Sequence, residues 1–164
     1  MDADEARKQL RPSSDDWTYH GIGPWTSVDG RAHILVEQTA FELTERNDAL
    51  VLRELPAPSY GGYAWSYNGG GPARAAAAIL ADALELGDPE SSGLEPGRSA
   101  DGLGRLRQDF CWDVLTQVGS EWRLRRGAIL RWVLGWYAEN GISDVPVATM
   151  NLPSAVPFID DDVY

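Results

Sequence analysis

Three consecutive glycines constrain the fold of this chain more than any other feature of its sequence. Gly69–Gly71 separate an aromatic segment from Pro72, which opens an Ala- and Leu-rich run. Proline suits the first turn of a helix, where its missing N–H costs no hydrogen bond, and alanine and leucine are strong helix formers. The sequence therefore predicts a helix over residues 73–86 that is entered through a sharp glycine elbow.

Short β-prone segments precede the elbow. Asp29-Gly30 is a favourable hairpin turn, and Tyr63, Trp65 and Tyr67 alternate along the chain, so we expect these three on one face of a strand. The expected strands cover residues 17–19, 25–28, 32–38, 49–55 and 60–67.

Two further helices are expected after a polar loop at residues 87–102. Leu106, Phe110 and Val114 repeat at intervals of four, which is typical of one apolar stripe on a helix over residues 103–118. A third helix is expected over residues 124–139. These elements predict an α+β fold, in which a small antiparallel sheet of three to four strands packs against three helices.

The length of 164 residues favours one domain, because two would each be close to the practical minimum for a core. Residues 1–16 are polar and rich in turn formers, and we expect a flexible leader there. Residues 17–141 would form the α+β domain. An extended acidic tail, residues 142–164, would follow, with Asp160–Asp162 near its end.

The cellular setting follows from what the sequence lacks. No run of eighteen apolar residues exists, so no membrane-spanning helix and no membrane partner are expected. The polar, acidic N-terminus is unlike a signal peptide, and the single cysteine, Cys111, excludes an internal disulfide framework. These features predict a cytoplasmic protein.

The segment Trp65–Pro72, Trp-Ser-Tyr-Asn-Gly-Gly-Gly-Pro, with the Ala-rich helix after it, resembles the signature of an uncharacterised bacterial family. This family is a domain of unknown function that phages and plasmids also carry. The later parts of the resemblance are Asp109-Phe110, Trp122-Arg123-Leu124, Ile129 and Trp132-Val133. The resemblance covers about residues 17–137 and implies a compact α+β accessory domain, often of mobile elements, without an established activity, cofactor or catalytic residue.

The elbow is also a candidate anion site, formed by Asn68, Gly69, Gly70, Gly71 and Arg74. Glycines before a helix can present backbone N–H groups and the positive end of the helix dipole to an anion. The spacing matches neither a P-loop nor a dinucleotide fingerprint, and the proline removes one donor. We favour the alternative, in which the glycines permit a sharp turn and close packing.

No catalytic residue, metal site or cofactor is expected. His20 and His33 lack a paired ligand at short spacing, and Cys111 lies on a core-facing helical stripe, so we expect a buried and inert thiol. A scattered catalytic triad remains open, because its members need not be close in sequence.

Two features are candidates for an interface. Trp112 lies off the apolar stripe, so we expect it to be exposed, and tryptophan is enriched among binding hot spots. Arg123, Arg125 and Arg126 would oppose the dipole at the start of the last helix, so acids of the same fold or of an acidic partner would have to compensate for them.

The formal net charge of −11 disfavours direct nucleic-acid binding. Residues 103–140 hold six arginines against four acids, a net +2, so the rest of the chain carries −13. We expect a non-enzymatic interaction or regulatory protein with a protein partner, and one version is an acidic decoy of a nucleic-acid-binding protein. The alternative is a small enzyme or ligand-binding domain that uses the glycine elbow.

Overall fold

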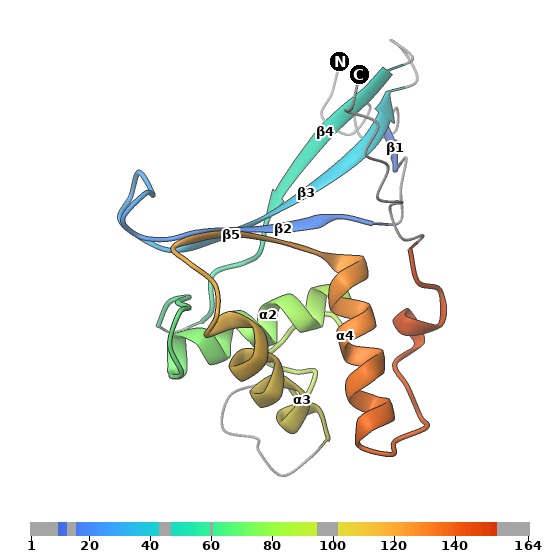
Figure 1. The fold of residues 1–164 in the computed structure, drawn as a ribbon. Coiled ribbons are helices and arrows are strands. Elements are labelled where there is room, and N and C mark those ends of the chain that lie inside the picture. The colour runs from blue at the N-terminus through green and yellow to red at the C-terminus, as the bar shows by residue number, and fades with distance from the viewer. Residues whose placement is uncertain (1–9, 13–15, 43–46, 60, 95–101, 154–164) are drawn as a thin grey trace, which may run out of the picture.

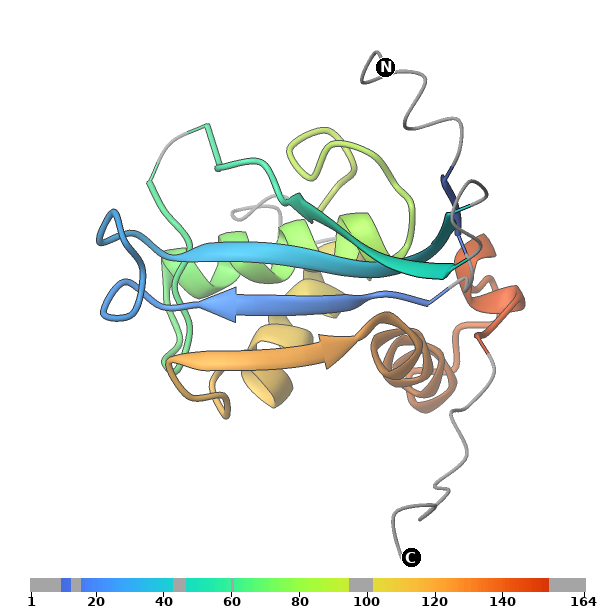
Figure 2. The ribbon, with the colours of Figure 1, turned by 90° about the horizontal axis from the view of Figure 1, so that it is seen from above.

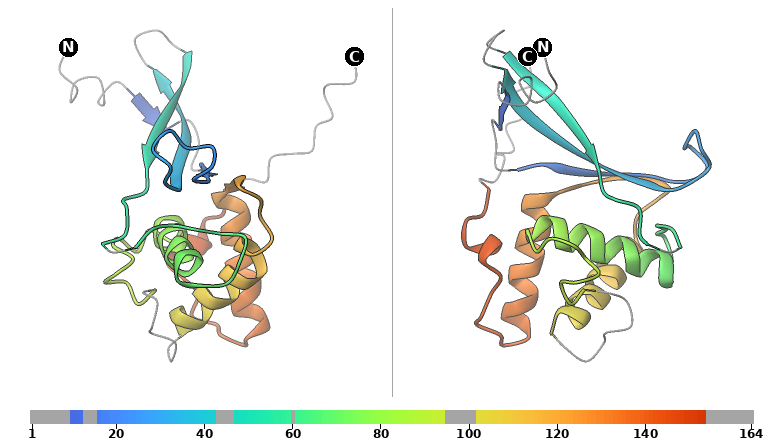
Figure 3. Two further views of the ribbon diagram at one scale, coloured as in Figure 1. Left: turned by 90° about the vertical axis from the view of Figure 1, so that its left-hand side faces the viewer. Right: turned by 180° about the vertical axis from the view of Figure 1, so that it is seen from behind.

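The computed structural model describes residues 10–12, 16–42, 47–59, 61–94 and 102–153. Within these residues, an antiparallel sheet forms one layer and α-helices form a second layer on one of its faces (Figure 1). The predicted α+β class is therefore confirmed. Figure 3 shows the same two layers from the side and from behind.

Five strands make up the sheet, and β3 is its central member. β3 pairs with β2 through residues 33–37, with β1 through residues 40–42 and with β4 through residues 35–42, while β5 pairs with β2. In the described part of the sheet β4, β5 and the short β1 therefore each have only one partner strand. The strands are β1 (Leu10–Pro12), β2 (Thr18–Ile22), β3 (His33–Glu42), β4 (Asn47–Glu54) and β5 (Glu121–Arg125).

The helices all pack below the same face of the sheet, and Figure 2 shows the opposite face bare. α3 continues directly into a π-helical turn, η1, and a 3₁₀ turn, η2, packs beside α4. The helical segments are α2 (Gly70–Ala83), α3 (Gly102–Phe110), η1 (Cys111–Leu115), α4 (Arg126–Glu139) and η2 (Val147–Met150).

The core lies between the two layers. Alternate residues of β2 and β3, among them Tyr19, Ile34 and Val36, are fully buried, because successive side chains of a strand point to opposite faces. Small alanines cover most of α2 and bring it close to the sheet, while Leu106 and Phe110 enter the core from α3. Each buried leucine or phenylalanine contributes about 2 kcal/mol through the apolar surface it removes from water.

The strand expected at residues 60–67 does not form in its described part, residues 61–67, and the aromatic residues there do not share a face. The backbone turns at Ser66, whose φ is 74°, and Ser66 donates to the Leu115 carbonyl over 2.8 Å. The Trp65 indole donates to Ser120, so Trp65 is buried while Tyr67 is exposed. Contacts with the end of η1 replace strand pairing here, which explains why the alternation misled the prediction.

The expected strand at residues 25–28 is also absent. The Gly23 carbonyl accepts hydrogen bonds from the backbone N–H groups of Thr26 and Ser27, which forms a turn and ends β2 at Ile22. The connection between β2 and β3 is therefore a long loop, residues 23–32, rather than a tight turn at Asp29-Gly30.

The third predicted helix begins two residues late, because residues 121–125 form β5 instead. Trp122 points into the core, whereas Glu121 and Arg123 are exposed. This alternation has the period of a strand, which the sequence prediction did not assign to residues 121–125. α2 begins three residues before its predicted start, at Gly70, and ends at Ala83.

The two ends of the described chain contact the domain. Leu10–Pro12 pair with β3, and the Asp16 carboxylate accepts a hydrogen bond from the Gly127 N–H over 2.9 Å. After α4, Leu152 packs against the core and Pro153 is buried, with the Pro153 carbonyl bound by Arg131. Asp160–Asp162 lie outside the described residues.

Candidate functional site

The glycine elbow is tightly packed. A Cβ at Gly71 would lie 2.6 Å from the Ala64 Cβ, and one at Gly69 would lie 2.7 Å from the Tyr67 ring. The Arg74 Nε donates to the Gly62 carbonyl over 3.0 Å, so this side chain supports the loop before the elbow. The Asn68 side chain contacts the Cys111 sulfur at 4.0 Å. These contacts agree with the packing role that we favoured for the glycines.

The arginines that were expected to cluster at a helix start are separated by the strand. Arg123 and Arg125 lie on β5 with exposed side chains, and Arg123 contacts Glu37 at 3.3 Å. Arg126 is buried; its Nε donates to the Ala83 carbonyl over 2.9 Å, and its guanidinium lies 4.2 Å from the Trp17 ring centroid. Arg126 therefore contacts the carboxyl end of α2, where a cation is favourable.

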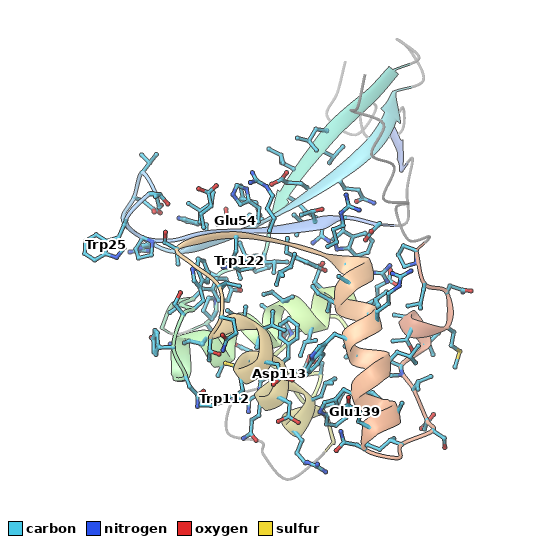
Figure 4. All side chains as sticks on the ribbon, viewed as in Figure 1. Trp25, Glu54, Trp112, Asp113, Trp122 and Glu139 are labelled. Atoms are coloured by element: carbon cyan, nitrogen blue, oxygen red, sulfur yellow. The ribbon has the colours of Figure 1, made fainter. Side chains whose placement is uncertain are left out.

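Trp112 is 62 % exposed on η1, as expected from its place off the apolar stripe. Figure 4 shows it on the helical layer, away from the sheet. Its neighbour Cys111 is buried, and this burial raises the pKa of the Cys111 thiol, which keeps it protonated and unreactive.

The bare face of the sheet carries two histidines, each held between two carboxylates. The His20 ring nitrogens lie 2.8 Å from Glu37 and 2.7 Å from Glu121. His33 contacts Asp29, at 2.8 Å, and Glu54, and the hydrogen bonds with these two groups raise its pKa. In both clusters the carboxylates bind opposite nitrogens of the ring, so the groups form hydrogen-bonded networks rather than a shared ligand set.

The loop between β2 and β3 presents apolar side chains on an ordered turn. Trp25 is 91 % exposed and Val28 is fully exposed. The Asp29 carboxylate accepts hydrogen bonds from Ser27 and from the Arg31 N–H, and it contacts His33. Figure 4 shows Trp25 at the tip of this loop, beyond the end of the sheet.

The edge of β4 has unpaired backbone groups in a defined order. The Leu55 N–H donates to the Ile34 carbonyl over 2.9 Å. Leu55 and Ile34 lie opposite each other when the β3–β4 register is continued, so they form a hydrogen-bonded pair. Hydrogen-bonded pairs alternate along an antiparallel ladder, so the backbone groups of Val51 and Arg53 also face β3. The N–H and C=O groups of the intervening residues face away from β3; we call these groups the β4 edge, and they belong to Leu50, Leu52 and Glu54.

The side chains along the β4 edge are exposed as well. Leu50 is 62 % and Leu52 is 58 % exposed. Arg53 contacts α2, on the helical side of the sheet, and the two leucines alternate with Arg53 along the strand. Both leucines therefore point to the bare face. Exposed leucines on an edge strand are unusual, because edge strands are normally protected by charges, prolines or covering segments.

A cleft of about 760 Å³ lies next to the end of β4. α2 supplies Ala77 and Ala78, and Tyr63 lies on the opposite loop. The remaining lining residues are Arg53, Glu54, Leu55, Pro56, Ala57, Pro58, Ser59, Arg74, Asp82, Gly87, Asp88, Pro89 and Glu90. The size is that of a ligand site, and the lining is largely apolar.

The charged side chains that line the cleft differ in whether they form ion pairs within the fold. Arg53 forms a bidentate ion pair with Asp82, with distances of 2.7 and 2.8 Å, and the Tyr19 hydroxyl also donates to Asp82. By contrast, Glu90 is exposed and binds Ser59, and Asp88 is exposed and accepts from the Glu90 N–H over 3.0 Å. The rim of the cleft is therefore acidic, while its cations are paired inside the fold.

Tyr63, which lines the cleft, has a shifted pKa. Burial, with a smaller effect of Glu54, raises the pKa of Tyr63 to about 12, so this phenol stays protonated and does not act as a base at neutral pH.

The described residues contain no group of three or more His, Cys, Asp or Glu side chains placed to bind a metal ion. No helix of the described chain has the length and apolar character needed to cross a membrane.

Comparison of the chain with protein-family models, with curated proteins and with solved structures gave no match. The candidate site is therefore identified from its geometry alone. Sequence reasoning placed β4 as a strand but missed both its free edge and the cleft, because strand order and the path of residues 55–63 are tertiary features. The exposed leucines carried one usable signal: Leu50 and Leu52 alternate with Val51 and Arg53, which predicts that one pair faces away from the helices.

Proposed function

We propose that this protein is a non-enzymatic interaction protein that binds another protein on the uncovered side of its sheet. The observation that carries the proposal is the exposure of Leu50 and Leu52 on an edge strand, on the face that the helices leave bare. Apolar side chains in such a place favour association, and the loop that carries Trp25 adds an exposed aromatic side chain. The proposal includes a cytoplasmic location and, from the family resemblance, a role as an accessory of a phage or plasmid.

The acidic decoy is one version of this proposal, and it receives less support from the described surface. A decoy needs carboxylates that are free to replace phosphates. Glu37 contacts His20 and Arg123, Glu54 contacts His33, and Asp82 is bound by Arg53, so many described acids are neutralised inside the fold.

A second candidate function, a small enzyme or ligand-binding domain with an anion site at the elbow, is favoured by one observation. The Arg74 guanidinium lies beside Gly70, at the first turn of α2. A thermal shift of several degrees with phosphate, sulfate or a nucleotide would support this candidate, because a ligand that binds only the native state raises its stability.

The test of the interaction function compares two pairs of exposed apolar residues. A partner that co-purifies from the native host is isolated, and its affinity is measured for two double variants, Leu50→Lys with Leu52→Lys and Val147→Lys with Met150→Lys. The second pair is equally exposed but lies on η2. We expect the first double variant to bind at least tenfold more weakly and the second to bind like the wild type. Equal affinities of the two double variants would overturn the proposal.

A further inference from the structure

The β4 edge and the cleft beside it form one surface with two kinds of contact. The backbone groups of Leu50, Leu52 and Glu54 repeat every second residue, a distance of about 7 Å, which is the spacing of a strand that has room for another strand. No contact of these backbone groups with another described residue is present. An extended segment can therefore extend the sheet here without displacing any described pairing.

The position of the cleft decides where the side chains of such a segment would go. In a new strand pair, the residues next to Val51 and Arg53 point to the same side as those residues, toward α2. Arg53 reaches Asp82 on α2, and both line the cleft together with Ala77 and Ala78. The side chain of the added strand next to Arg53 would enter the cleft, because Arg53 lines it and Val51 does not, and the side chains on the other face would lie beside Leu50 and Leu52.

The charge of the rim selects the kind of side chain. Asp88 and Glu90 line the cleft with exposed carboxylates, whereas Glu54 is held by His33. The cleft-lining arginines are engaged with Asp82 and with the Gly62 carbonyl. The apolar lining, which includes Tyr63 and Pro56, suits the aliphatic stem of a long side chain whose charged end reaches the rim. Lysine and arginine have both parts.

We infer that the partner contributes an extended basic segment, which pairs with the β4 edge as an additional strand and places a lysine or arginine side chain in the cleft. The inference rests on the proposed function and names its binding mode and the chemistry of the partner. Strand addition supplies affinity through main-chain hydrogen bonds, and the cleft supplies specificity through the side chain that lies next to Arg53.

The test uses a phage-displayed library of random ten-residue peptides, selected on the wild-type protein after depletion on a Leu52→Pro variant. The Leu52 N–H faces away from β3, so proline removes a donor of the β4 edge while every bond to β3 is retained. We expect the enriched peptides to share a Lys or Arg at one fixed position, the one that lies next to Arg53. No enrichment, or enrichment of neutral or acidic peptides, would overturn the inference.

Synthetic copies of the enriched peptides then locate the contact by amide hydrogen exchange. The amides of Leu50, Leu52 and Glu54 should become protected, whereas those of Val51 and Arg53, already bonded to β3, should not change. Peptides methylated at alternate backbone nitrogens test the same bonds on the wild-type protein, so the result does not depend on the folding of the proline variant. Binding without this pattern of protection would overturn strand addition.

Charge recognition is measured with two matched double variants. Asp88→Asn with Glu90→Gln removes two charges from the rim, and Asp113→Asn with Glu139→Gln removes two exposed charges from the helical layer, far from the sheet (Figure 4). We expect the rim variant to weaken peptide binding about threefold to tenfold at low salt and the other to leave it unchanged. Equal effects would overturn the choice of a basic segment. A partner that contacts the bare face without protecting the β4 edge would leave the proposed function standing and overturn only this inference.

Discussion

Gly70 and Gly71 are neighbours in the elbow, yet a methyl group would meet different surroundings at the two positions. At Gly71 it would lie 2.6 Å from the Ala64 Cβ and 3.2 Å from the Ala64 backbone nitrogen. At Gly70 it would meet only the end of the flexible Arg74 side chain, at 3.2 Å. Neither glycine has a positive φ, so close packing and not backbone strain distinguishes the two positions.

We therefore expect Gly71→Ala to lower the free energy of unfolding by about 1–3 kcal/mol, which is typical of overpacking. Gly70→Ala should be neutral or slightly stabilising, because alanine is the better helix former. Urea unfolding curves of both variants provide the measurement. If the two substitutions had the same effect, the elbow would not owe its glycines to packing against Ala64.

His33 gives the bare face a pH dependence whose sign is fixed by its partners. Hydrogen bonds with Asp29, and then with Glu54, raise the pKa of His33 above its usual 6.5. The stability that comes from protonated His33 is fully present below about pH 6.5 and is lost as the pH rises through the raised pKa.

The urea midpoint should therefore fall as the pH rises above about 6.5, and a His33→Gln variant should show a smaller fall over the same range. Asp29→Asn should reduce the fall in the same way, because it removes the larger cause of the shift. A pH dependence of the His33→Gln variant identical to that of the wild type would show that this histidine does not contribute.

At the scale of elements, Arg126 lies at the junction of β5 and α4 and connects it to α2 and to Trp17, the residue before β2. Its Nε donates to the last carbonyl of α2, at Ala83, and its backbone N–H donates to Trp17 over 2.8 Å. Removing a buried charged donor leaves its acceptor without a hydrogen bond. Arg126→Met should therefore cost about 1–3 kcal/mol of unfolding free energy, whereas Arg125→Met, at the exposed neighbour, should change it by less than about 0.5 kcal/mol. Similar losses for the two variants would contradict this connection.

Elements with a strong local period were predicted well, and elements defined by tertiary contacts were not. The helices after the elbow and the strand at β4 follow from their apolar periods. Residues 60–67 have the period of a strand, but their hydrogen bonds with the end of η1 prevent strand pairing. The sequence predicted the exposure of Trp112, which lies outside the proposed site, whereas the free edge of β4 depends on strand order, which no local pattern specifies.

For the whole molecule, the distribution of charge in space matters more than its distribution along the sequence. Residues 103–140 have a net charge of +2 in sequence, but the structure disperses their arginines. Arg123 and Arg125 lie on the bare face of the sheet, Arg126 is buried, and Arg105 lies near Trp136 on the helical layer. The described surface consequently does not gather these residues into one basic face.

We expect no binding of mixed-sequence duplex or single-stranded DNA at about 0.15 M salt. Affinity for nucleic acid depends on cations that neutralise phosphates and release counterions, and at this salt concentration charges act over only about 8 Å. The exposed Arg123 is itself in contact with Glu37, so a phosphate would have to compete with a carboxylate of the same fold. Fluorescence anisotropy titrations of both DNA forms provide the measurement, and Glu37→Gln is the informative variant, because it frees Arg123 and tests whether internal pairing suppresses binding. Micromolar binding by the wild type that weakens steeply with added salt would contradict the prediction and also remove the acidic decoy version of the proposed function.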